Sequence, residues 1–308
     1  MDRTASSGGR RRRARGSGFV RYWIKEWSSW LLVVPSVLFF LFFSWEPLLR
    51  GIYLSFFETR GFEPVRFIGL QNYVDVVSHS VFWQILRNTF VYVFWSLVLG
   101  FFVPIAVAIL VNEMRWLQSF FRVSAYFPSM VPGIAAAMLW MFLFEPSEHG
   151  LVNMALGLLG IAPLGWLQDS SLTIVTIVLT MTWRGFGAIM LLFLANLQSI
   201  NNELYEAAAI DGASIRHKLA HIMLPHISPL IGLTLILQIS GVFQIFNEPL
   251  VLTEGGPNNA SMTLQLQSYF YAFRYFEAGR SVALGVITFL ILMVITLVFF
   301  RLQKKVSD

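Results

Sequence analysis

Six long apolar runs constrain the fold of this chain more than any other feature. A helix needs about 20 mostly apolar residues to cross the hydrocarbon core of a membrane. The runs are Trp30–Leu49, Asn88–Asn112, Val123–Phe144, Ser171–Ile200, Ile227–Asn247 and Ser281–Phe300. They contain only two charged residues, Glu46 and Arg184. Strands of a membrane barrel would instead alternate over short segments. We therefore predict an all-α membrane protein with six transmembrane helices.

The composition supports this class and excludes several others. The chain is 56% hydrophobic and 13% charged, whereas soluble domains carry about 25% charged residues. It contains no cysteine, which excludes disulfides, thiolate metal sites and cysteine nucleophiles. The net charge of +5 reflects a basic cluster at Arg10–Arg15. We interpret that cluster as a contact with anionic lipid rather than with nucleic acid.

The distribution of Lys and Arg predicts the orientation. If the N-terminus lies inside, fifteen of the 22 Lys and Arg residues fall on the inner side and six on the outer side, with Arg184 inside a span. Inner loops carry the excess of positive charge, so both termini are expected in the cytoplasm. We predict a basic cytoplasmic tail at 1–28, a membrane domain at 29–303 and a cytoplasmic end at 304–308.

The chain has no recognisable energy source of its own. None of its four lysines, Lys25, Lys218, Lys304 and Lys305, lies in the phosphate-binding pattern GxxxxGK[ST]. We therefore expect a transport subunit rather than an enzyme, driven by a separate subunit. The alternative is an ion-coupled carrier or channel complete in one chain. That class predicts inverted repeats and several acidic groups within the membrane, and the sequence shows neither.

A polar stretch between the fourth and fifth runs differs from its surroundings. It reads EAAAIDGASIRHKLAHIMLP, from Glu206 to Pro225. We predict a helix from Glu203 to about Ala209, capped by Asn201 or Asn202. A turn at Gly212 and a second helix from Ser214 to about Met223 follow, and Leu224-Pro225 ends it. The result is a cytoplasmic helix-turn-helix with small residues that let a partner surface come close.

The spacing of this stretch resembles the EAA loop of ABC importer permeases. The matching residues are Glu206-Ala207-Ala208, Gly212, Ile222 and Leu224-Pro225. In that family the loop is a coupling helix that docks on an ATPase subunit. The resemblance implies a coupling loop at about 201–225 and a coupling role for five residues: Glu206, Ala207, Ala208, Asp211 and Gly212.

Other segments resemble the carbohydrate branch of the same family. They are LTEGGPNNASMT at Leu252–Thr263, FIGLQNYVDV at Phe67–Val76, RNTFVYV at Arg87–Val93 and the segment Leu194–Ala213. The resemblance implies the type I ABC importer permease fold in a bacterial or archaeal cytoplasmic membrane. The implied partners are a second homologous permease, two ATPase subunits that hold ATP and Mg, and an extracytoplasmic binding protein.

The implied cargo is a carbohydrate, expected to be a di- or oligosaccharide. An anionic cargo such as glycerol phosphate or an acidic oligosaccharide is the alternative, because Arg184 lies within a span. The Gly-Gly-Pro loop disfavours amino acids and peptides. No cofactor is expected in this chain.

A polar stripe marks a candidate substrate path. Ser240, Gln244 and Asn247 have the i, i+4, i+7 spacing that places side chains on one helical face. Glu248 follows directly, and Trp183 and Arg184 lie in the fourth run. The alternative is that these groups join helices to one another, at about 0.6 kcal/mol per hydrogen bond, with Arg184 paired to Glu248.

Two histidines have the spacing of a helical metal pair. His217 and His221 stand four residues apart. No third ligand is apparent in the sequence, so we predict no metal site.

Overall fold

The fold is described here from a computed structural model covering residues 27–114 and 116–307. The basic tail predicted at 1–28 therefore lies almost entirely outside the described residues. The chain divides into two units, one ending at Tyr53 and one beginning at Leu54.

The first unit is an apolar helix with little polar surface. It comprises α2 (Trp27–Phe40), a π-helical turn η1 (Leu41–Trp45) and all but the last residue of α3 (Glu46–Leu54). Residues 31–50 are exposed throughout. The stretch Leu31–Leu54 is long and apolar enough to cross a membrane, in agreement with the first predicted span. A helix that is apolar on all sides suits a lipid or protein environment rather than water.

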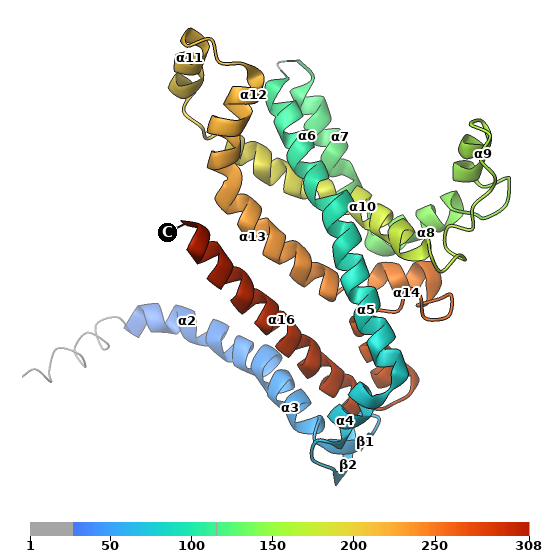
Figure 1. Cartoon of the computed structure of the whole chain (residues 1–308). Coiled ribbons are helices and arrows are strands. Elements are labelled where there is room, and N and C mark those ends of the chain that lie inside the picture. Colours follow the sequence, from blue (N-terminus) through green and yellow to red (C-terminus); the bar gives the residue numbers. More distant parts are fainter. Residues whose placement is uncertain (1–26, 115, 308) are drawn as a thin grey trace, which may run out of the picture. The chain divides into compact units, whose positions relative to one another are not determined.

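The second unit contains all the remaining elements (Figure 1). In chain order they are β1 (Phe57–Arg60), β2 (Glu63–Phe67), α4 (Gln71–Ser78), α5 (Ser80–Trp95), η2 (Ser96–Phe101), α6 (Phe102–Glu113), α7 (Gln118–Met130), α8 (Gly133–Leu143), α9 (Leu151–Gly157), α10 (Thr173–Leu197), α11 (Asn202–Ile210), α12 (Ile215–Lys218), η3 (Leu219–Met223), α13 (Leu224–Phe243), α14 (Asn247–Thr253), α15 (Leu264–Tyr269), η4 (Phe270–Arg274) and α16 (Ala278–Ser307). Figure 1 places α11 and α12 at one end of this unit and α4, β1 and β2 at the other.

Four continuous helices of this unit are long and apolar enough to cross a membrane. They are Ser80–Glu113, Thr173–Leu197, Ile215–Phe243 and Ala278–Lys304. They confirm four of the predicted spans, with shifted boundaries. The short antiparallel hairpin of β1 and β2 is an addition that the all-helical prediction did not include.

The third predicted span, Val123–Phe144, is not one continuous helix. It falls into α7 and α8, which are bent by 97° at the break between them. Val131 precedes Pro132 and is extended, with φ −73° and ψ 129°, because a residue before proline avoids the helical region. Within the described part of the chain, the bent pair completes six candidate spans if it crosses the membrane as a single span.

The fifth predicted span also has different limits. Its helix ends at Phe243, and Asn247 begins the separate helix α14. The prediction that Ser240, Gln244 and Asn247 share one helical face is therefore wrong. The backbone leaves the helix at Gln244, with φ −103° and ψ 11°, so the spacing rule does not extend to Asn247.

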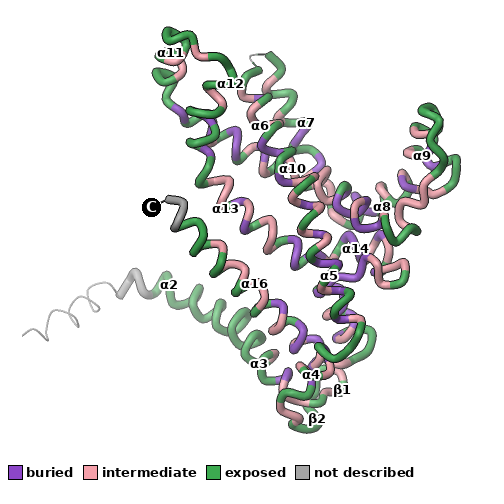
Figure 2. The backbone as a smooth tube through the Cα atoms, viewed as in Figure 1, coloured by how far each residue is buried: buried purple, intermediate pink, exposed green. Residues whose placement is uncertain are grey.

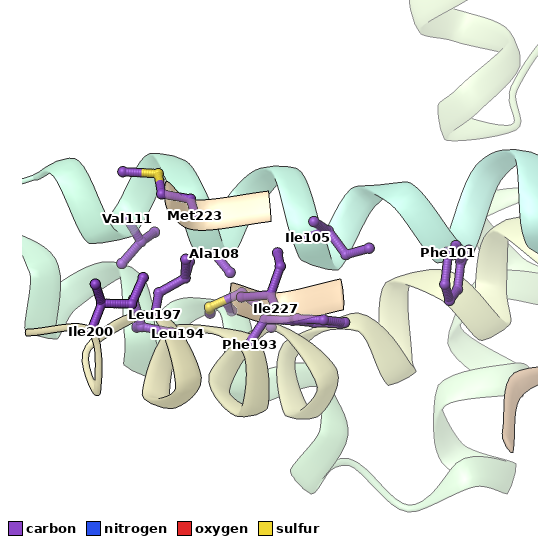
Figure 3. Packing of buried hydrophobic residues seen from close by; sticks show 12 residues of the cluster. Phe101, Ile105, Ala108, Val111, Phe193, Leu194, Leu197, Ile200, Met223 and Ile227 are labelled. Carbon is purple, nitrogen blue, oxygen red and sulfur yellow. The ribbon is translucent and has the colours of Figure 1, made fainter. Parts of the chain in front are cut away.

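The core is built around α10. Its buried side chains pack with those of η2, α6 and the start of α13 (Figure 3), and the buried positions follow these helices (Figure 2). Phe193, Leu194 and Leu197 of α10 lie against Ala108 and Val111 of α6. Gly187 lets α10 approach α7 closely, because a Cβ there would lie only 1.9 Å from the carbonyl oxygen of Ala125.

Candidate functional site

A cavity of about 480 Å³ lies between η2, α10, α13 and the start of α14. We call it the interior cavity. Its walls are mainly apolar, and its polar groups come from four elements: Ser96, Thr182, Arg184, Thr234, Gln238, Gln244, Asn247 and Glu248. A concave, mostly apolar site with a few convergent polar groups is typical of ligand binding.

An ion pair forms one wall of this cavity. The Arg184 guanidinium donates to Glu248 through Nη2, at 2.9 Å from Oε1. The Glu248 side chain is 9% exposed and that of Arg184 is 36% exposed. The pairing considered as an alternative in the sequence is therefore present. Because each charge compensates the other, the cavity holds no net charge from these two residues.

The other predicted path residues divide into two groups. Gln244 and Asn247 line the interior cavity. Ser240 and Trp183 do not line it. The Trp183 ring instead packs edge-on against Trp140, with 5.6 Å between ring centroids. The backbone carbonyl of Ser240 accepts a hydrogen bond from Gln244.

Sequence reasoning did not select the three hydroxyl residues of the cavity wall, Ser96, Thr182 and Thr234. A hydroxyl residue within an apolar run is a weak signal, because its side chain can bond to the helix backbone. Ser96 does so, donating to the carbonyl of Val93. For Thr182, the only feature of the sequence that indicates a place in the cavity wall is its position two residues before Arg184.

The Gly-Gly-Pro segment forms a loop held by buried polar side chains. Asn88 of α5 donates to the carbonyls of Asn259 and Met262, at 2.7 and 3.1 Å. The hydroxyl of Tyr92 donates to the carbonyl of Ser261 at 3.1 Å. These contacts join the two segments: Arg87–Val93 carries the donors that fix the backbone of Leu252–Thr263.

The polar stretch forms the predicted pair of helices at the opposite end of the unit. The Asn201 side chain accepts from the backbone N–H of Glu203 and caps α11. Gly212 has φ +71°, a left-handed conformation that glycine adopts without strain. The N–H of Ala213 returns to the carbonyl of Ala208 at 2.8 Å, which closes the end of α11. The helix from Glu203 and the turn at Gly212 are therefore confirmed.

The second helix of this pair does not end at Leu224-Pro225 as predicted. The chain stays helical from Ile215 to Phe243, through the π-helical turn η3. The N–H of Leu224 bonds to the carbonyl of Leu219, five residues back. The π-helical turn ends at Met223 and α13 begins at Leu224. Pro225 therefore stands in the first turn of α13, where its missing N–H is tolerated.

The five predicted coupling residues lie together on this helical pair. Four of them, Glu206, Ala207, Asp211 and Gly212, are exposed, and Ala208 is partly buried. Ile210 beside them is 87% exposed, a feature that the sequence prediction did not use. A large apolar side chain at the tip of a polar element favours a protein partner, although single exposed apolar residues are common.

Tyr205 connects α11 to the core. Its ring packs against the buried cluster around α10. Burial raises the pKa of the Tyr205 hydroxyl, and the nearby Glu113 carboxylate raises it further. The hydroxyl is buried and has no hydrogen-bond partner among the described residues. The ring, rather than the hydroxyl, is therefore what holds α11 against the bundle.

The two histidines of this region are adjacent but make no larger cluster. The rings of His217 and His221 stack with 4.6 Å between centroids. Over residues 27–114 and 116–307, no group of three or more metal-ligating side chains was found.

These features define a class of protein: a helical membrane protein with an internal cavity that holds a few polar groups, and a protruding helical pair joined to it. A family model described as "Binding-protein-dependent transport system inner membrane component" matches residues 97–308. The chain belongs to this family of ABC transport permeases. It is an inner-membrane component with several membrane-spanning helices and a transport subunit rather than an enzyme.

Relatives match almost the whole chain. The arabinooligosaccharides transport system permease protein AraP of Bacillus subtilis is 32% identical over 284 residues, covering 92% of this chain and 90% of that protein. The lactose transport system permease protein LacF of Rhizobium radiobacter is 33% identical over 291 residues, covering 92% and 95%.

A solved structure shares the fold. One chain of a bacterial ABC transporter involved in the import of the acidic polysaccharide alginate superposes with a TM-score of 0.84, covering 94% of this chain and 99% of that one. The sequence identity is 22%. The similarity establishes the type I ABC importer permease fold.

Proposed function

We propose that this chain is the permease subunit of an ATP-driven importer of a neutral di- or oligosaccharide. The α11–α12 pair is the main support for this proposal, because its exposed residues offer a surface on which a partner protein can dock. The sugar names of the relatives AraP and LacF support a carbohydrate cargo. The compensated Arg184–Glu248 pair removes the reason to expect an anionic one.

The partners follow from the same features. Two ATPase subunits, which hold ATP and Mg, dock at Glu206, Ala207, Ala208, Asp211 and Gly212 on the cytoplasmic side. A second homologous permease completes the path, and an extracytoplasmic binding protein delivers the sugar at the other end. The exposed apolar helix of residues 31–50 offers surface for lipid and for the second permease.

The mechanism depends on a continuous connection from α11 to the interior cavity. Tyr205 holds α11 against the core around α10. The helix that begins at Ile215 runs without interruption to Phe243, and its far end supplies Gln238 and Gly241 to the cavity wall. A displacement of the pair therefore moves two walls of the cavity, α10 and α13. Gln244 and Asn247 offer hydrogen bonds to sugar hydroxyls there.

The coupling role is tested in the reconstituted importer. Glu206→Lys reverses the charge at the proposed ATPase contact, and Gly212→Trp adds bulk at the turn. Both variants should lose the ATPase during purification and lose ATP-driven sugar uptake. Glu63→Lys, an exposed charge reversal in β2 at the opposite end, should retain both. Full ATPase binding and uptake in the two test variants would refute the assignment.

A further inference from the structure

A second cavity lies apart from the interior cavity. It has a volume of about 690 Å³ and is formed by the α4–α5 junction, the Gly-Gly-Pro loop, α15, η4 and the start of α16. We call it the distal pocket, because α4 lies at the end opposite to α11 (Figure 1). It shares no lining residue with the interior cavity. Its size is within the range of ligand sites.

The distal pocket combines an apolar floor with aromatic and polar walls. Phe82, Met262 and Leu284 are buried in one hydrophobic cluster and form part of the floor. Tyr271 and Tyr275 line the wall, with 6.1 Å between their ring centroids. Burial raises the pKa of the Tyr271 hydroxyl, so it remains a neutral donor and acceptor at physiological pH.

The charged groups of the pocket compensate one another. Arg280 donates to Glu277 at 2.9 Å and to Asp75 at 3.1 Å. Arg274 lies 3.8 Å from Glu254 and covers the ring of Phe270. The two guanidinium groups that line the pocket are thus matched by carboxylates. An anionic ligand would meet these carboxylates, and a cationic ligand would meet the guanidinium groups.

The pocket is preformed. The loop residues Asn259 and Met262 on its wall are held by Asn88 of α5. Gln84, one turn earlier, donates to the carbonyl of Asn258 at 3.0 Å. Preorganised walls lower the entropic cost of binding, so a weak polar ligand can still be retained.

We propose that the distal pocket is a second saccharide site, which binds rings of a neutral oligosaccharide before they reach the interior cavity. This inference rests on the proposed carbohydrate function. The C–H face of a pyranose or furanose ring packs on flat aromatic surfaces such as Tyr271 and Tyr275. Its hydroxyls match the paired donors and acceptors around them. Gln267 adds an amide that can hydrogen-bond to a sugar. The ring of His79, whose Nδ1 accepts from the backbone N–H of Val81, adds a second polar group.

The test uses the complete transporter in lipid nanodiscs, without the binding protein and without nucleotide. Binding of maltotriose, raffinose and arabinotriose is titrated by saturation-transfer NMR, with trigalacturonate as the anionic comparison. We expect a neutral trisaccharide to bind, and Tyr271→Ala and Tyr275→Ala each to weaken binding about tenfold. Tyr275 is 52% exposed, so its removal leaves the fold intact. Phe273→Ala, in the same turn but outside the pocket, should bind like the unmodified protein.

Three results would overturn the proposal. They are the absence of binding by all three neutral probes, unchanged binding in both tyrosine variants, and tighter binding of trigalacturonate. Binding that is lost only in Gln244→Leu would place the sugar in the interior cavity instead. The carbohydrate function itself is judged separately, by ATP-driven uptake with the binding protein present. A transporter that takes up no carbohydrate refutes that function, whatever the nanodisc titration shows.

Discussion

Replacing Arg184 should lower the stability of the fold much more than replacing its partner Glu248. Arg184→Gln leaves the Glu248 carboxylate, whose side chain is 9% exposed, without its counter-charge. Removing one member of a buried pair costs about 3–5 kcal/mol. Glu248→Gln leaves a guanidinium that is 36% exposed in the interior cavity, where water solvates it, and the glutamine oxygen still accepts. That loss should be about 1–2 kcal/mol, after discounting for solvent screening.

The assay is thermal unfolding of the purified transporter, followed by tryptophan fluorescence. At about 2 °C per kcal/mol for a chain of this size, Arg184→Gln should lower Tm by about 6–10 °C. The double variant Arg184→Gln/Glu248→Gln should recover part of this loss, because no unpaired charge remains. Arg274→Gln is the matched control, since its pair with Glu254 is exposed on both sides and is expected to contribute about 0–1 kcal/mol. Equal Tm values for Arg184→Gln and Glu248→Gln would refute this reasoning. A double variant with a Tm as low as that of Arg184→Gln would also refute it.

Three further predictions concern the path, the packing and the coupling. Gln244→Leu should lower the kcat/KM of uptake about tenfold, because hydrogen bonds to the sugar are lost. Ser240→Ala, outside the interior cavity, should leave the uptake kinetics unchanged. If the two variants have the same kcat/KM, Gln244 is not part of the path. Gly187→Ala places a Cβ 1.9 Å from a backbone oxygen of α7 and should lower the free energy of unfolding by at least about 1–3 kcal/mol, measured by thermal unfolding. Gly185→Ala is the control, because a Cβ there has nothing within 4 Å, and its Tm should be unchanged. Tyr205→Ala should reduce ATP-driven uptake at least about fivefold, by the loss of ring packing worth about 1 kcal/mol or more. Tyr205→Phe should transport normally, because only the ring packs, and impaired transport by that variant would show that the hydroxyl has a partner in the assembly.

The membrane-spanning helices and the α11 cap were predictable because their causes are local. A run of 20 apolar residues has few alternatives to a membrane helix. Asn201 caps α11 through a contact two residues away, and Gly212 turns the chain through its own backbone freedom. The resemblance to the EAA loop implied an ATPase partner, which no local rule provides.

The parts that failed depend on packing between distant segments. Hydropathy does not register the 97° bend before Gly133, although Pro132 is a local indication of a break. The end of α13 at Phe243 separates Asn247 from Gln244 without any proline or glycine at the break. Arg184 and Glu248 are 64 residues apart, so their pairing could be proposed from the sequence only as one of two alternatives.

The positions of the irregular turns bear on how force passes through this chain. The turn η3 lies between the exposed helical pair and α13, so the chain passes Pro225 without a break. Had Pro225 ended the helix, α12 would be joined to the membrane by a flexible link, and its displacement would be lost there. The break at Gln244 lies instead at the far end, next to the interior cavity. If α12 and α13 move as one helix, the first place where the backbone can bend is therefore Gln244, between α13 and Glu248 of the ion pair. This arrangement places the compliant point of the helix at the proposed substrate path rather than at the proposed coupling surface.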